Sequence, residues 1–247
     1  MRKLIRYDLF RAFHQPSTFV LFAIALVFAL ISVADATFFS EEPSGDLVLT
    51  FGNALASGKD VILLLAGCVC GMLIGEDFSV GSYSLGVCSG YTRRKILGGR
   101  TISCFIIISM MLTEYMLIAT VLSMIYVKPF VLADLIRLIV LSALHIFHFC
   151  MENMLCILIC FVLKKKVNAT AVCLFINLIL FSLLGALCTK VELLTPLYLK
   201  AVPVLTYTMF AGNEKVFTVL GSTLAYLIIT AAIFLATDKI FKKEELV

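Results

Sequence analysis

The sequence predicts an all-α membrane protein, a single transmembrane domain over residues 1–247 with six transmembrane helices. Hydrophobic residues make up 62% of the chain and charged residues 15%, whereas soluble domains contain about 45–50% and about 25%. The apolar residues form uncharged runs close to the roughly 20 residues that cross a bilayer as a helix. Basic residues concentrate in alternate connections between these runs, which indicates an orientation.

Residues 1–16 precede the first apolar run and predict a helix lying in the membrane surface. Ile5, Leu9 and Phe13 recur every four residues and form an apolar stripe, which is typical of interfacial amphipathic helices. Basic residues flank this stripe: Arg2, Lys3, Arg6 and Arg11. The alternative is an ordinary helical extension into the cytoplasm. The first apolar run, 19–33, has no small-residue cleavage site before Asp35, so we interpret that run as a span and not as a signal peptide.

The six expected spans are residues 17–37, 61–74, 101–126, 135–163, 169–187 and 216–236. The second is short, and residues 54–60 can extend it. Residues 188–215 are too apolar for a plain loop, but Pro196 and Pro203 interrupt them. They predict an extracellular interfacial or re-entrant segment before the last span, because irregular backbone at membrane depth must be shielded by protein.

Charge placement predicts that both termini are cytoplasmic. The clusters at the N-terminus, at 93–100, at 164–166 and in the charged tail fall on one side, and only isolated lysines fall on the other: Lys59, Lys128, Lys190, Lys200 and Lys215. Cytoplasmic connections carry this excess of Lys and Arg. No basic face is interleaved with aromatic residues, which argues against a nucleic-acid partner. Of the nine cysteines, seven lie in apolar runs and are expected to be reduced and buried.

Residues 75–100 predict a cytoplasmic connection with a short helix. An acidic pair, Glu76 and Asp77, precedes the nearly uncharged stretch 82–87, and the basic residues Arg93, Arg94 and Arg100 follow it. Acidic residues before a helix and basic residues after it match the helix dipole. Such an apolar stretch needs a surface to pack against, in this protein or in a partner.

This segment resembles the type-2 ABC transporter permease family. In that family an acidic residue and an aromatic are followed by a glycine with a small hydroxyl residue, a short coupling helix, a second glycine, an arginine and a further basic residue. The corresponding positions here are Asp77-Phe78, Gly81-Ser82, Gly90, Arg93 and Arg100. Serine stands where threonine is common, and Arg100 where lysine is common. The basic N-terminal helix, the six spans and the outer segment 188–215 extend the resemblance along the chain.

The resemblance implies a transport subunit and not an enzyme. The sequence lacks the G-x-x-x-x-G-K-[ST] phosphate loop, so ATP and magnesium would be bound by separate ABC ATPase subunits docking beneath residues 75–100. A second copy of the permease, or a paralogous permease, would complete the pathway. The expected ATPase-coupling residues are Glu76, Asp77, Phe78, Gly81, Ser82, Gly90, Arg93, Arg94 and Arg100. The compact size and the lack of a large extracellular domain resemble the permeases of lantibiotic-immunity and antimicrobial-peptide exporters of the bacterial cytoplasmic membrane. This resemblance implies the export of an amphipathic or antimicrobial peptide or a similar hydrophobic compound.

Ionisable residues inside the expected spans form a second group of candidates. Glu114 lies in the third span, while His145, His148 and Glu152 lie three and four residues apart in the fourth, on one helical face beside Asn153. Such residues usually face a cavity or one another. They indicate either a metal or proton site, or a polar seam of neutral histidines bonded to Glu152, Asn153 or Glu114. We favour the seam and expect no bound metal or cofactor in this chain.

Two alternative functions remain open at the level of sequence. An ATP-independent ion or metal carrier would use Glu114, His145, His148 and Glu152, and its flux would depend on protons or metal without any ATPase. A non-transporting membrane scaffold in a sensory complex would bind an ATPase but export nothing.

Overall fold

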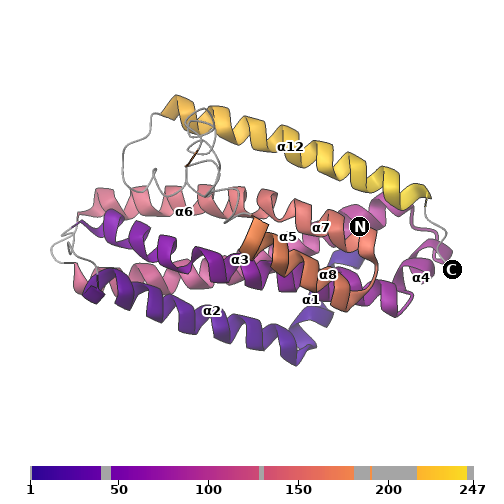
Figure 1. The fold of residues 1–247 in the computed structure, drawn as a ribbon, viewed down its shortest axis with the longest axis horizontal. Helices are drawn as coiled ribbons and strands as arrows, with labels where there is room; N and C mark the ends of the chain where they lie inside the picture. Colours follow the sequence, from indigo (N-terminus) through magenta and orange to yellow (C-terminus); the bar gives the residue numbers. More distant parts are fainter. Residues whose placement is uncertain (1, 40–45, 128–130, 181–189, 191–215, 244–247) are drawn as a thin grey trace.

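The computed structural model describes residues 2–39, 46–127, 131–180, 190 and 216–243, and these are helical with short connections and no strand. Figure 1 shows the long helices lying side by side along one axis. Their bounds are α1 Arg2–His14, α2 Pro16–Ala34, the π-helical turn η1 Asp35–Phe39, α3 Leu47–Ser79, α4 Ser82–Cys88, α5 Arg93–Tyr126, α6 Leu132–Glu152, α7 Met154–Leu163, α8 Lys166–Phe175, η2 Ile176–Leu180 and α12 Val216–Lys243.

Five helices of the described residues are long and apolar enough to cross a membrane: Pro16–Phe38, Val61–Phe78, Arg93–Tyr126, Leu132–Leu163 and Thr223–Lys242. This confirms an all-helical chain with several membrane-spanning segments. The fifth expected span, 169–187, is described only to residue 180. With about 1.5 Å per residue, α8 and η2 together extend about 22 Å. Residues 181–187, and 188–215 apart from Lys190, lie outside the described residues, so the sixth crossing and the re-entrant segment stay predictions.

The helices on either side of α4 are longer than the sequence predicts. Helix α3 has 33 residues and continues to Ser79, and α5 has 34 residues and begins at Arg93. Of the expected connection 75–100, only residues 80–92 lie outside the two long helices. At 1.5 Å per residue α5 is about 50 Å long, which exceeds the roughly 30 Å hydrocarbon core. The charged ends of these helices are consequently available to pack against other elements outside the lipid.

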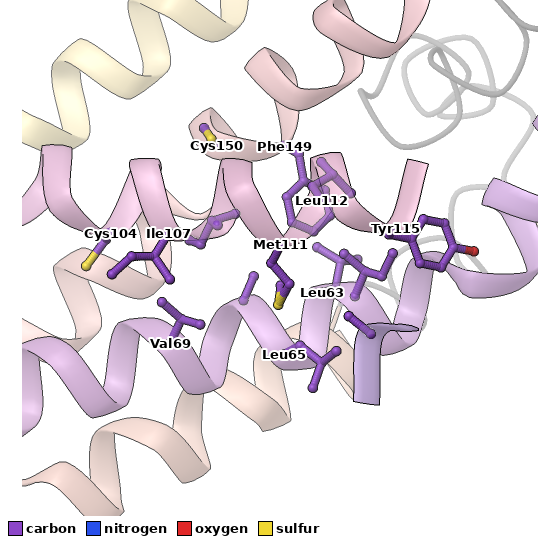
Figure 2. Packing of buried hydrophobic residues seen from close by; sticks show 14 of the residues in the cluster. Leu63, Leu65, Val69, Cys104, Ile107, Met111, Leu112, Tyr115, Phe149 and Cys150 are labelled. Atoms are coloured by element: carbon purple, nitrogen blue, oxygen red, sulfur yellow. The ribbon is translucent and has the colours of Figure 1, made fainter. Parts of the chain in front are cut away.

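Helix α3 lies at the centre of the bundle and packs against α2, α5, α7 and α8. Figure 2 shows Leu63 and Val69 of α3 facing Ile107 and Met111 of α5, with Phe149 of α6 covering them. All five side chains are buried. The interior is thus built from aliphatic, methionine and aromatic side chains of three helices, which is the composition that the apolar runs predict.

A row of glycines on α3 allows the close approach of α8. Gly67, Gly71 and Gly75 recur every four residues, so they share one helical face. A Cβ atom on Gly71 would lie 2.9 Å from the Cα of Thr170, and one on Gly75 would lie 2.6 Å from the Cα of Lys166. Small residues at this spacing let helix backbones meet in membranes. The row fixes α8 against the C-terminal half of α3.

The ends of α1, α4 and α12 gather at the same end of the bundle (Figure 1). Helix α1 packs on α5, and the Arg93 guanidinium at the start of α5 donates to the carbonyls of Phe241 and Lys242 near the end of α12. The N-terminal helix and the end of the last helix are therefore on one side, as an even number of crossings requires.

Candidate functional site

The short helix α4 is bounded by two glycines in the left-handed region. Gly81 has φ 71° and Gly90 has φ 84°. This conformation costs most other residues about 1–2 kcal/mol, and glycine adopts it without a steric penalty. Beyond Gly90, the Thr92 side chain caps α5 by accepting a hydrogen bond from the Lys95 amide at 3.4 Å. The two glycines let the chain reverse on both sides of α4 within a few residues.

Tyr83 anchors α4 to the ends of three long helices. Its side chain is 1% exposed, and its ring centroid lies 4.2 Å from that of Phe78 in α3, 5.6 Å from Phe161 in α7 and 5.4 Å from Phe241 in α12. Burial raises the pKa of the Tyr83 hydroxyl well above its ordinary value. The Arg100 guanidinium lies 5.8 Å from the ring centroid. Movement of α4 would therefore be transmitted to α3, α7 and α12 through one aromatic cluster.

Four charged residues form a buried network behind α4. The Arg11 guanidinium donates to an Asp77 carboxylate oxygen at 2.5 Å, and the other oxygen of Asp77 lies 2.8 Å from Nε of Arg100. Arg100 also forms an ion pair with Asp8. Asp8, Asp77 and Arg100 are almost completely buried. Two carboxylates thus balance two guanidiniums where α1, α3 and α5 meet, and burial of such charges is tolerable only when they are paired.

Further polar contacts connect this network to its neighbours. The Ser103 hydroxyl donates a hydrogen bond to Asp8 at 3.0 Å, and Ser82, at the start of α4, lies near the Asp77 carboxylate. Burial disfavours the charge of Arg11, but the adjacent Asp77 carboxylate outweighs it and raises the pKa of Arg11. The network therefore ties the amphipathic N-terminal helix to the end of α3, close to the first residue of α4.

A second, more exposed cluster surrounds Glu76. Its carboxylate accepts hydrogen bonds from Gln15 and from Lys166, each at 3.1 Å. The Lys166 and Glu76 side chains are 44% and 25% exposed. These contacts bring together the ends of α1, α3 and α8. Of the lysine run 164–166, Lys166 thus has a structural partner in addition to the topological role that the sequence predicts.

The structure places the expected coupling residues in two groups. Asp77, Phe78, Ser82 and Arg100 face inward toward the network and the aromatic cluster, and Arg93 bonds the end of α12. Gly90 and Arg94 lie on the outer surface. Two apolar side chains at and before α4 are also exposed, Val80 at 65% and Leu85 at 67%. A partner approaching α4 would therefore find apolar as well as basic side chains exposed, while the inward residues contact the long helices.

Sequence reasoning missed the roles of Asp8, Arg11, Tyr83 and Leu85. Asp8 is the one acidic residue in a basic helix, and a lone acid on an interfacial helix is a signal for an internal partner. Tyr83 and Leu85 are two residues apart in α4, so they point in different directions. From that spacing, one of the two is expected to pack inward when the other is exposed, as Tyr83 and Leu85 do.

The intramembrane ionisable residues lie apart from α4. His148 is fully buried and its Nε2 lies 2.8 Å from the Thr223 hydroxyl of α12, a partner that the sequence did not predict. The Asn153 amide donates to the Phe149 carbonyl at 2.9 Å, where α6 gives way to α7. Glu114 is only partly buried, on α5. Among the described residues, no group of three His, Cys, Asp or Glu side chains could hold a metal ion. His145 and Glu152 therefore belong to no such group.

No protein-family model matches the chain, and no curated protein matches its sequence.

Proposed function

We propose that this chain is the membrane subunit of an ATP-driven exporter of the ABC type, and that α4 is its coupling helix. The observation that carries the proposal is the attachment of α4. Leu85 of this helix is exposed, while Tyr83 packs inward in the aromatic cluster and Ser82 lies near Asp77. A force applied to the outer surface would reach α1, α3, α5, α7 and α12 through contacts that already exist.

The proposed complex contains ABC ATPase subunits, which bind ATP and magnesium, and two permease chains, identical or paralogous. The ATPase would dock on the apolar surface of Val80 and Leu85 and its basic edge at Arg94. The glycine hinges at Gly81 and Gly90 would let α4 tilt as a unit. The permease supplies the pathway in a bacterial cytoplasmic membrane, with both termini inside, and the partner supplies the hydrolysis.

For the cargo, we propose an amphipathic or antimicrobial peptide of the lantibiotic kind. The support is the resemblance of the chain, in its compact size and its lack of a large extracellular domain, to permeases of this class. A resistance assay tests the cargo separately from the assembly. Expression of the chain with its ATPase should raise the tolerated peptide concentration, and an ATPase variant unable to hydrolyse ATP should not.

The test of the assembly is affinity purification of the tagged chain from its native host in mild detergent. We expect an ATPase with a phosphate loop to purify with the wild-type protein. Leu85→Glu, at a side chain that is 67% exposed, should abolish this association because it puts a charge into an apolar contact. Val131→Glu is the matched control, since Val131 is 63% exposed at the opposite end of the bundle.

The outcomes separate the competing functions. An ATPase bound equally by wild type and Leu85→Glu would refute α4 as its docking site. The absence of any ATPase from a folded preparation would refute the exporter and leave an ATP-independent carrier, whose flux is measurable with the purified chain in liposomes. An ATPase that binds without any peptide resistance would favour the scaffold.

A further inference from the structure

The outer face of α1 carries unbalanced positive charge. Arg2, Lys3 and Arg6 are exposed, and none of them has an ion-pair partner among the described residues. The single acidic residue of the helix, Asp8, is 1% exposed and neutralised by Arg100 on the opposite side. All the charged side chains that α1 presents away from the bundle are therefore basic.

The same face has a shallow groove of about 420 Å³ lined by Arg2, Ile5, Arg6, Leu9, Phe10 and Phe13. Its two arginines lie at the N-terminal end, and its apolar side chains continue toward Phe13. Phe10 is 62% exposed, which is unfavourable in water but favourable at the acyl boundary of a bilayer. The groove thus combines a cationic end and an apolar floor, as an acidic headgroup with its acyl chain requires.

The position of α1 is fixed by contacts that do not use this face. Arg11 donates to Asp77 at 2.5 Å and to the Leu73 carbonyl at 3.2 Å, and Asp8 is bonded to Ser103. The inner face of α1 is therefore fully occupied against α3 and α5. The outer face lies at the same end of the bundle as the basic start of α5, where an anionic leaflet surface would lie.

We propose that the groove on α1 is a binding site for one anionic phospholipid of the cytoplasmic leaflet. Arg2 and Arg6 donate to the headgroup phosphate, and Lys3 contributes charge at the edge. An acyl chain lies along Ile5, Leu9 and Phe13. Charge complementarity selects the acidic lipid, and the apolar floor selects a lipid over a soluble anion. The site does not depend on an ATPase partner, so its test is independent of the test of the exporter.

The experiment is the retention of phosphatidylglycerol by the purified chain from nanodiscs that also contain excess phosphatidylcholine, measured by mass spectrometry of the co-purified lipid. Each basic residue near an anionic surface contributes about fivefold in affinity, so R2Q/R6Q should lower the affinity about 30-fold. R2K/R6K, which keeps both charges, should retain the lipid. R94Q/K95Q removes two exposed charges at the same end of the bundle and should also retain it.

Equal loss in R2Q/R6Q and R94Q/K95Q would show only bulk electrostatic attraction and would overturn the site. Displacement of the lipid by inorganic phosphate alone would reassign the groove to a soluble anion, and displacement by a co-purifying acidic protein would reassign it to a protein partner. Should R2Q/R6Q fail to fold, the wild-type protein provides the test. Its lipid retention should fall as salt screens the contact, and retention unaffected by salt would contradict the proposal.

Discussion

Asp77 is the residue on which the charge network depends, because it is shared by Arg11 of α1 and Arg100 of α5. Removing one partner of a buried ion pair destabilises by about 3–5 kcal/mol, since the remaining charges lose their compensation. Asp77→Asn should therefore lower the melting temperature of the detergent-purified protein markedly. A thiol-reactive fluorescent dye can follow the melting, because most cysteines of the described residues are buried, with the exposed Cys88 replaced by serine.

The control for Asp77→Asn is its neighbour. Glu76→Gln weakens a partly exposed pair with Lys166, and such pairs contribute about 0–1 kcal/mol. We expect Glu76→Gln to melt within a few degrees of the parent protein. Equal melting of the two variants would contradict the conclusion that the buried network, and not the outer pair, fixes α1 to α3 and α5.

Gly90 provides a test of backbone conformation without side-chain interference. A Cβ atom at this position would meet no atom within 4 Å, so Gly90→Ala should destabilise only through the left-handed φ of 84°, by about 1–2 kcal/mol. Gly90→Asn should cost less, because asparagine tolerates this region. The dye-based melting experiment compares the two. A Gly90→Ala variant as stable as the parent would show that the turn can rearrange.

At the residue scale, the structure gives contacts for the expected coupling residues, while their role in coupling stays a prediction. Gly81 and Gly90, expected from the resemblance, both have positive φ. The pairing of Asp8 with Arg100 was not predictable, because it requires α1 to pack on α5 across a long sequence separation. Asp77 and Arg100 were expected to couple to an ATPase, and the structure places both where they contact other helices of the same chain.

At the element scale, the glycine row of α3 gives a direct prediction about helix packing. Gly75→Ala would place a Cβ atom 2.6 Å from the Cα of Lys166, so α8 would have to move, and overpacking of this kind costs about 1–3 kcal/mol. Gly221→Ala is the control, because a Cβ atom there meets nothing within 4 Å and alanine favours a helix by about 1 kcal/mol. Melting should fall for Gly75→Ala and stay level or rise for Gly221→Ala.

Should both glycine variants melt alike, the close packing of α3 on α8 would be refuted. Gly71→Ala offers an independent check on the same row, because its Cβ atom would lie 2.9 Å from the Cα of Thr170. Each contact is with backbone, so no change of rotamer can relieve it.

Hydropathy located the helices but not their ends. The second span was expected over 61–74, with 54–60 able to extend its helix; the segment that can cross a membrane does begin at Val61, but it continues to Phe78. The helix itself begins earlier, at Leu47, where the Asp46 side chain accepts a hydrogen bond from the Val48 amide at 2.9 Å. A span predicted from hydropathy ends at charged residues. Asp77 and Arg100 nevertheless lie within helices, because they neutralise one another inside the bundle. The break between α6 and α7 at Asn153 was also missed, since no proline or glycine marks it.

At the scale of the whole molecule, alternating helix directions place α1, the start of α5 and the end of α12 together, so the basic clusters that they carry are on one side. Composition and the spacing of basic residues were sufficient to predict this arrangement, because both follow from the energetics of the bilayer. The partner, the cargo and the docking surface were not predictable in the same way. They depend on which side chains, such as Leu85, the packing of α4 leaves exposed.

The orientation itself is testable with one cysteine. Cys88 is the only exposed cysteine among the described residues, and it lies at the end of α4, which we expect in the cytoplasm. With Cys188 replaced by serine, a membrane-impermeant maleimide should label Cys88 in inside-out vesicles and not in intact cells. Val131→Cys, combined with Cys88→Ser, should show the reverse, because Val131 is 63% exposed at the opposite end. Labelling of Cys88 from outside intact cells would invert the topology and remove α4 from the reach of any cytoplasmic ATPase.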